Sequence, residues 1–223
     1  MKRFWVSLLT VLIYALAQFL PGMLLRSGLI QPEKGMETTQ FMIYTQVSLF
    51  IVAAILIILI NLYIKNPTRL EAGVKESKRY IISWALLGFC IVMVYQVVVS
   101  LIYTLVLGQQ QQSPNTERLM AIAKQMPVFI ILISVVGPIL EEFVFRKVLF
   151  GELYNAIKGN RIVAFLIASI VSSLLFALAH NDIKFLPMYF GMGMLFSLAY
   201  TYTHRIAIPV SYTHLTLPTK RIV

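Results

Sequence analysis

Glu141, Glu142 and Arg146 are three ionisable residues inside the apolar run 128–150, where leucine or valine would be the ordinary lipid-facing choice. An ionisable side chain near the centre of a bilayer costs roughly 2.5 to 3.5 kcal/mol on insertion scales, so such residues indicate function. Carboxylates at such a place can handle protons, ligate a metal or hold helices together. The cluster therefore predicts a functional site within a membrane span.

Helical spacing divides this cluster into two parts. Residues four apart share one face of a helix, so Glu142 and Arg146 can form an ion pair while Glu141 points about 100° away. The pair neutralises itself, and Glu141 is left as the better candidate for a group that handles protons. The alternative is that the cluster only locks helices together.

Phe176 and His180 are also four residues apart, and they share a face at the end of the next apolar run. One alternative is that His180 only caps that run at the outer interface. A carboxylate and an imidazole at one height can activate water by general-base catalysis. Both are also zinc ligands, but a catalytic zinc usually has three protein ligands and no HExxH motif is present. No cofactor is required, and zinc or another divalent metal stays open.

A short turn around Gly159 joins the two runs, and helices joined by a short loop are antiparallel neighbours. Glu141 lies 18 residues before Gly159, and His180 lies 21 residues after it. At about 1.5 Å per residue the rises are roughly 27 and 31 Å, so the two side chains are expected at nearly the same height. This geometry requires the fourth helix to continue past Phe150 through Ile157.

The composition indicates an integral membrane protein. Of the 223 residues, 59% are hydrophobic and 13% are charged, and the mean hydropathy is +0.81. Soluble domains lie far from these values. Runs of about 20 apolar residues can cross a bilayer, and six are present: 4–25, 41–64, 80–107, 128–150, 162–180 and 185–202. The expected fold is all-α, a polytopic transmembrane helical bundle.

The net charge of +10 is spread over the loops and not gathered on one soluble face. Such a pattern reports membrane orientation more than nucleic-acid binding. Basic residues are most numerous before the first span, after the second and after the fourth. The positive-inside rule makes these loops cytoplasmic. We therefore expect a multi-pass protein of the cell membrane with a cytoplasmic N-terminus.

Residues 141–146 match an EExxxR pattern and residues 176–180 match FxxxH, in this order and each within a span. With the preceding Gly137-Pro138, the region 126–210 resembles the CAAX-prenyl-protease and bacteriocin-processing (CPBP, or Abi) intramembrane proteases. In that family the first glutamate of EExxxR and the histidine of FxxxH activate the water that attacks the peptide bond.

The resemblance implies roles for five residues of this chain. Glu141 and His180 would activate the water. Glu142 and Arg146 would complete the catalytic set as an orienting ion pair. Phe176 would pack beside the site and contribute to substrate binding.

The family pattern continues with a third motif in a later helix, a histidine followed by an asparagine, which stabilises the oxyanion. This sequence lacks it, because His214 lies near the expected place but Pro218 stands four residues on. The tail 211–223 is polar, cannot span a bilayer and resembles translated sequencing-adapter read-through. We therefore expect an N-terminal three-span region 1–125, an incomplete CPBP-like protease core 126–210 and a non-native tail 211–223. One or two further spans are expected in the intact protein.

The residues and the resemblance together predict an intramembrane endopeptidase acting on a membrane-associated substrate of CAAX type or of leader and bacteriocin type. Its partners would be the lipid bilayer and a peptide or lipidated protein, with no nucleic acid. One alternative is a non-catalytic bacteriocin-immunity or peptide-binding membrane protein of the same fold, which the absent third motif favours. Another is a transporter with a proton relay, against which stands the lack of an inverted repeat or of paired broken helices.

Overall fold

The structure is a computed structural model that describes residues 2–64, 67–108 and 113–213, and every regular element in these ranges is helical. Six helical segments are long and apolar enough to cross a membrane: Arg3–Arg26, Thr38–Tyr63, Lys78–Val106, Val128–Ala156, Arg161–Ala179 and Ile183–Thr203. The predicted all-α polytopic bundle is confirmed. The expected boundaries agree within a few residues, except that the fourth span is longer.

The long helices outside the fourth span are α1 (Lys2–Arg26), α2 (Thr38–Tyr63), α3 (Ile81–Leu107), α8 (Arg161–Ala179) and α9 (Leu186–Thr203). Shorter elements between and after them are η1 (Lys78–Tyr80), α4 (Pro114–Gln125), η4 (Ile183–Phe185) and α10 (Ala207–Thr213). Large aliphatic side chains on α1, α2, α3 and α8 are exposed, as a lipid-facing surface requires. These helices enclose the fourth span.

The fourth span is one continuous helix of alternating geometry, which we call the central helix. It comprises α5 (Val128–Ile131), the π-helical η2 (Leu132–Val136), α6 (Gly137–Glu141), the π-helical η3 (Glu142–Phe150) and α7 (Gly151–Ala156). Pro138 lacks an N–H and its ring clashes with the preceding turn of a straight α-helix. The wider i→i+5 turn of η2 lies directly before it and relieves this conflict.

The predicted continuation of this helix past Phe150 is confirmed as far as Ala156. Ile157 already has an extended backbone, with φ −77° and ψ 111°, so the helix ends one residue earlier than expected. Gly159, with φ +96°, then makes the turn into α8. Positive φ is readily adopted by glycine because it has no Cβ.

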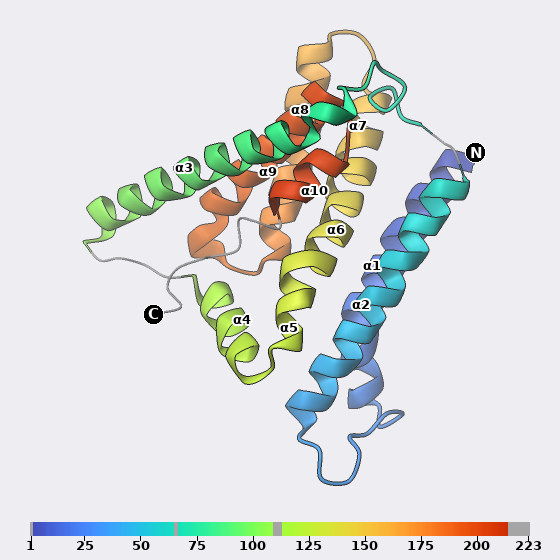
Figure 1. The fold of residues 1–223 in the computed structure, drawn as a ribbon, viewed down its shortest axis with the longest axis vertical. Helices are drawn as coiled ribbons and strands as arrows, with labels where there is room; N and C mark the ends of the chain where they lie inside the picture. Colours follow the sequence, from blue (N-terminus) through green and yellow to red (C-terminus); the bar gives the residue numbers. More distant parts are fainter. Residues whose placement is uncertain (1, 65–66, 109–112, 214–223) are drawn as a thin grey trace.

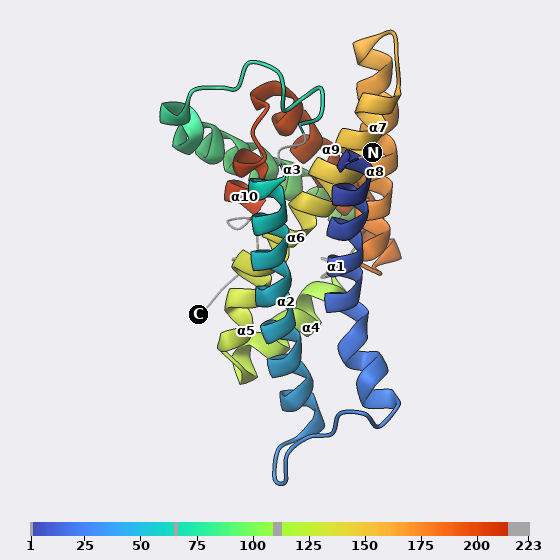
Figure 2. The ribbon, with the colours of Figure 1, turned by 90° about the vertical axis from the view of Figure 1, so that its right-hand side faces the viewer.

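Figures 1 and 2 show the antiparallel pair α1 and α2 on one side of the central helix, with α8 and α9 on another and α3 beyond α9. The N-terminus, the α2–α3 loop and the α7–α8 turn lie at one end of the bundle, which we call the basic end. The α1–α2 loop and α4 lie toward the opposite end, the far end. The central helix therefore lies between the α1–α2 pair and the α8–α9 pair.

Glycines allow the closest helix contacts of the site region. A Cβ at Gly193 of α9 would lie 2.8 Å from the Cβ of Ser173 on α8, and a Cβ at Gly191 would overlap the ring of Tyr95 on α3. Helices in membranes approach closely where such small residues face each other. Gly193 thus brings α9 close to α8, and Gly191 brings α9 close to α3.

The proposed non-native tail falls mostly beyond the described part of the chain. Ser211 to Thr213 complete helix α10. Residues 214–223, with His214 and Pro218, lie outside the described residues. The foreign origin of the tail, the missing third motif and the division at residues 125 and 210 therefore stay predictions.

Candidate active site

Glu142 and Arg146 form the predicted ion pair at the centre of the bundle. Arg146 Nε lies 3.5 Å from Glu142 Oε2, and both side chains are fully buried. The guanidinium carbon also lies 4.2 Å from the ring centroid of Phe176 and 4.9 Å from that of Phe196. Aromatic faces attract a cation, most strongly where water is excluded. Arg146 is therefore compensated by a carboxylate on its own helix and by rings on α8 and α9.

Phe176 packs between this ion pair and His180. Its ring lies edge-on to Phe145, with centroids 5.3 Å apart, and is only 1% exposed. Its backbone carbonyl reaches His180, as described below. Phe176 therefore contacts the candidate catalytic residues directly, and its predicted contribution to substrate binding stays a prediction.

His180 follows the last residue of α8 and has a defined hydrogen-bond partner. Its Nδ1 lies 2.8 Å from the carbonyl oxygen of Phe176. A carbonyl can only accept, so we assign the proton of the neutral ring to Nδ1, which leaves the lone pair on Nε2. Burial lowers the pKa of this imidazole below its usual value. The contact thus fixes the orientation of the imidazole and leaves Nε2 as a hydrogen-bond acceptor.

Glu141 is the last residue of α6, one position before the π-helical segment begins. It is partly exposed and interacts electrostatically with Tyr14 of α1 and with Arg146. Among the described residues, no hydrogen bond or ion pair joins Glu141 directly to His180. The two groups share Arg146 as an electrostatic partner.

The expectation of equal heights needs a correction. Ser172 Oγ on α8 donates to the carbonyl of Phe145 at 2.6 Å, so these two residues mark one level. Glu141 lies four residues from that level and His180 eight, or about 6 and 12 Å. His180 is thus about one turn nearer the far end than Glu141. The rises of roughly 27 and 31 Å expected from the sequence already differed by about 4 Å, so the contact widens the expected offset only slightly.

Side-chain direction reduces this offset. In a helix each Cα–Cβ bond tilts toward the N-terminus. The central helix starts at the far end, so the Glu141 side chain tilts toward the level of His180. Helix α8 starts at the basic end, so the His180 side chain tilts toward the level of Glu141. The antiparallel arrangement therefore tilts each side chain along the bundle toward the level of the other.

The donor set fits a metal ion poorly. Within the residues that the structure describes, no three His, Cys, Asp or Glu side chains gather as a metal-ligand group. Glu142 is engaged by Arg146, which leaves Glu141 and His180, and a catalytic zinc usually has three protein ligands. We derive no chemical step through a metal.

Tyr189, Ser113 and Asp182 are site residues that the sequence reasoning missed. The Tyr189 ring stacks on His180, with centroids 4.0 Å apart. Its hydroxyl lies 3.1 Å from Ser113 Oγ, which donates to Asp182. No helical spacing links these positions, because they lie on α9, at the start of α4 and in the α8–α9 turn. The one available signal was a tyrosine in an apolar run, whose hydroxyl needs a partner.

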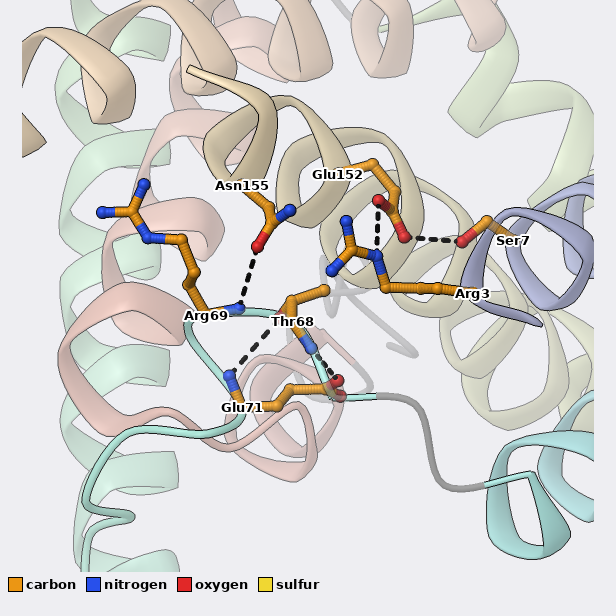
Figure 3. Close-up of polar contacts among 7 residues, drawn as sticks. All are labelled: Arg3, Ser7, Thr68, Arg69, Glu71, Glu152 and Asn155. Atoms are coloured by element: carbon orange, nitrogen blue, oxygen red, sulfur yellow. Dashed lines mark hydrogen bonds and ion pairs between the residues drawn. The ribbon is translucent and has the colours of Figure 1, made fainter. Parts of the chain in front are cut away.

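Figure 3 shows a separate polar cluster at the basic end, formed by seven residues of α1, the α2–α3 loop and α7. Arg3 and Ser7 of α1 bind the Glu152 carboxylate at 3.0 and 2.8 Å. The backbone N–H of Arg69 donates to Asn155 at 3.3 Å. These contacts tie α1 and the α2–α3 loop to the end of the central helix.

The chain is similar in sequence to known membrane proteases. Residues 123–216 match the family described as Type II CAAX prenyl endopeptidase Rce1-like. The chain is 61% identical to the "Membrane-embedded CAAX protease MroQ" of Staphylococcus aureus (strain USA300) over 210 residues, which are 94% of this chain and 85% of the relative. The chain belongs to the Rce1-like CAAX protease family.

A second relative supports membership of the Rce1-like family. The "Putative membrane peptidase YdiL" of Bacillus subtilis (strain 168) is 34% identical over 223 residues, which cover 98% of this chain and 87% of the relative. No solved structure matches the chain. The predicted family is thus confirmed, and the chain is a CAAX-protease-like membrane endopeptidase. The matched region contains Glu141, Glu142, Arg146, Phe176 and His180.

Proposed function

We propose that this endopeptidase hydrolyses a peptide bond of a membrane-associated substrate with a water activated by Glu141 and His180. The observation that carries the proposal is the hydrogen bond between His180 Nδ1 and the Phe176 carbonyl at 2.8 Å. It assigns the lone pair to Nε2, on a ring directed toward the level of Glu141. General-base catalysis needs such an acceptor close to the reacting water.

Each step follows from the protonation states of these two groups. Glu141 takes a proton from the water while His180 Nε2 accepts a hydrogen bond from the same water and orients it. The water oxygen then bonds to the peptide carbonyl carbon, whose oxygen becomes negative. When the tetrahedral intermediate collapses, the carbon–nitrogen bond breaks and protonated Glu141 gives its proton to the leaving amine. Glu141 is thereby restored as a carboxylate.

The Glu142–Arg146 pair supports this chemistry without exchanging protons. Because Arg146 is compensated by Glu142 and by the rings of Phe176 and Phe196, its position in the core is fixed. It contacts the central helix, α8 and α9 at once. The pair therefore holds in register the helices that carry Glu141 and His180.

The names of the relatives support one substrate class over another. The family description and the Staphylococcus aureus relative both name CAAX substrates. We therefore propose a CAAX-type or similar lipid-anchored polypeptide as the favoured substrate, with leader-bearing peptides such as bacteriocins as the second class. Both would reach the site from the bilayer.

A cleavage assay with purified full-length protein in detergent tests this proposal. Quenched peptides of three kinds would be compared: prenylated CAAX peptides, their unprenylated counterparts, and leader-bearing peptides. We expect the wild-type protein to cleave the prenylated peptides fastest and the variant His180→Gln to lose about 10² to 10⁴-fold in kcat. Equal cleavage by wild type and His180→Gln would refute the mechanism. Faster cleavage of leader peptides would refute the substrate assignment alone.

A further inference from the structure

Tyr189 lies against His180 and belongs to a buried polar network at the far end of the site. The Tyr189 ring and the imidazole are stacked, with an angle of 25° between their planes. The hydroxyl of Tyr189 is 3.1 Å from Ser113 Oγ, and Ser113 Oγ is 2.5 Å from Asp182 Oδ2. All three side chains are at most 8% exposed. The network thus joins α9, the start of α4 and the α8–α9 turn.

The direction of the hydrogen bonds in this network is determined by Asp182. An ionised carboxylate only accepts, so the single hydroxyl proton of Ser113 points to Asp182. Ser113 Oγ can then only accept from Tyr189, whose hydroxyl must be the donor. Ser113 Oγ also accepts from the backbone N–H of Thr116 at 3.3 Å and so caps helix α4. Tyr189 is therefore held by the hydrogen bond of its hydroxyl to Ser113 and by the stacking of its ring on His180.

The imidazole of His180 is enclosed by two aromatic rings. Tyr189 covers one face, and the Phe176 ring lies at 64° to the imidazole with centroids 4.6 Å apart. The Nδ1 bond to the Phe176 carbonyl needs one orientation of the ring, because a flipped ring would present carbon to that oxygen. A ring stacked on an anchored partner has less freedom to flip.

We propose that Tyr189, anchored by Ser113 and Asp182, is a positioning residue that keeps the His180 ring oriented with Nε2 available to accept the hydrogen bond of the water. The inference rests on the proposed function, which does not itself require Tyr189. If Tyr189 served only to fill space, an apolar side chain could replace it without loss of turnover. Removing its hydrogen bond to Ser113 would then have no effect on turnover either.

Kinetics of the purified full-length protein separate these two roles. We expect Tyr189→Leu to lower kcat on the order of tenfold to a hundredfold with KM little changed. The His180 imidazole would be misplaced in this variant, whereas substrate binding would not be affected. Tyr189→Phe keeps the stack and loses only the hydroxyl, so kcat should fall about fivefold. Ser113→Ala removes the same hydrogen bond together with the cap of α4 and the partner of Asp182, so kcat should fall at least as much. The double variant should be no worse than Ser113→Ala, because the Tyr189–Ser113 hydrogen bond can be lost only once.

Tyr103→Phe is the matched control. The Tyr103 hydroxyl donates to the carbonyl of Lys184 at 2.7 Å, in the same α8–α9 connection, but none of its contacts reaches His180. This variant should retain wild-type kcat. An equal loss in Tyr103→Phe and Tyr189→Phe would overturn the proposal, because it would show a general need for an ordered connection. Wild-type kcat in Tyr189→Leu would overturn it directly.

A spectroscopic test keeps the inference independent of peptidase activity. The chain has three histidines, so ¹⁵N-histidine labelling and the loss of one signal set in His180→Gln identify His180. The wild-type ring should be protonated at Nδ1, and Tyr189→Leu should show a mixture with the Nε2-protonated form. An unchanged single form in Tyr189→Leu would refute the positioning role. An inactive wild-type protein with this tautomer shift would refute the proposed function and leave the positioning role standing.

Discussion

Arg146 carries a charge at a fully buried position, and three contacts at the residue scale explain how it is held there. The Glu142 carboxylate compensates its charge, and the faces of Phe176 and Phe196 lie against its guanidinium. The Glu142 contact was predictable, because residues four apart meet on one helix whatever surrounds it. The ring contacts were not, because they depend on how α8 and α9 cross the central helix. The contact of Tyr189 with His180 could not be predicted for the same reason.

Removing one partner of the buried pair should be strongly destabilising. Glu142→Gln removes the carboxylate paired with the fully buried Arg146, which should lower the free energy of unfolding by about 3 to 5 kcal/mol. Glu152→Gln is the matched control, since its side chain is 29% exposed and exposed pairs contribute about 1 kcal/mol or less. Thermal unfolding of both variants in one detergent measures the difference. Similar losses in the two variants would contradict the account of the buried pair.

The imidazole of His180 should bind its second proton at a lower pH than an ordinary histidine does, because its pKa is lowered. Burial lowers its pKa, and Asp182 and Arg146 act on it in opposite directions. As the pH falls, the ring should therefore accept its proton only below the usual pKa of about 6.5. NMR titration of the labelled ring, with His180→Gln to identify the signals, measures this. A midpoint at or above 6.5 would contradict a buried neutral base.

At the scale of helices, the order and lengths of the spans were predictable and the relative heights of their residues were not. Apolar run length identified all six spans, because crossing a bilayer sets a minimum length. The height estimate assumed α-helical rise throughout, whereas η3, which lies between Glu141 and the turn, is π-helical. Counting from the Ser172–Phe145 contact gives an offset of about 6 Å between Glu141 and His180, against the roughly 4 Å expected from the sequence.

The α8–α9 contact should be sensitive to a single methyl group. Gly193→Ala would bring a Cβ to 2.8 Å from that of Ser173 and force the two helices apart, lowering stability by about 1 to 3 kcal/mol. Turnover should fall as well, because these helices carry His180 and Tyr189. Gly22→Ala in α1 is the control, since nothing lies within 4 Å of its new Cβ. Thermal unfolding and kcat of both variants are compared. Equal stability of the two variants would contradict the packing argument.

At the scale of the whole molecule, the two ends of the bundle carry different sets of polar contacts. The basic end holds the contacts of Arg3, Ser7 and Arg69 with the end of the central helix (Figure 3). The far end carries the network of Ser113, Asp182 and Tyr189 beside His180. The site therefore lies between a charged anchor and a polar network. The positive-inside rule predicts that the basic end faces the cytoplasm.

Cysteine labelling tests this orientation. In a Cys90→Ser background, Ser27→Cys places a thiol in the α1–α2 loop and Ser77→Cys places one in the α2–α3 loop, both at exposed positions. A membrane-impermeant maleimide added to intact cells should label Ser27→Cys only. Both variants should be labelled after permeabilisation. Labelling of Ser77→Cys in intact cells would reverse the proposed topology.

The most direct test of the central claim is the single-turnover cleavage rate of Glu141→Gln in full-length protein. Glutamine keeps the size of the side chain but cannot take the proton of water, so the rate should fall about 10² to 10⁴-fold. Glu152→Gln makes the same chemical change at the basic end and should cleave like the wild type. A Glu141→Gln protein that unfolds like the wild type and cleaves at the wild-type rate would contradict the proposal that Glu141 activates the water.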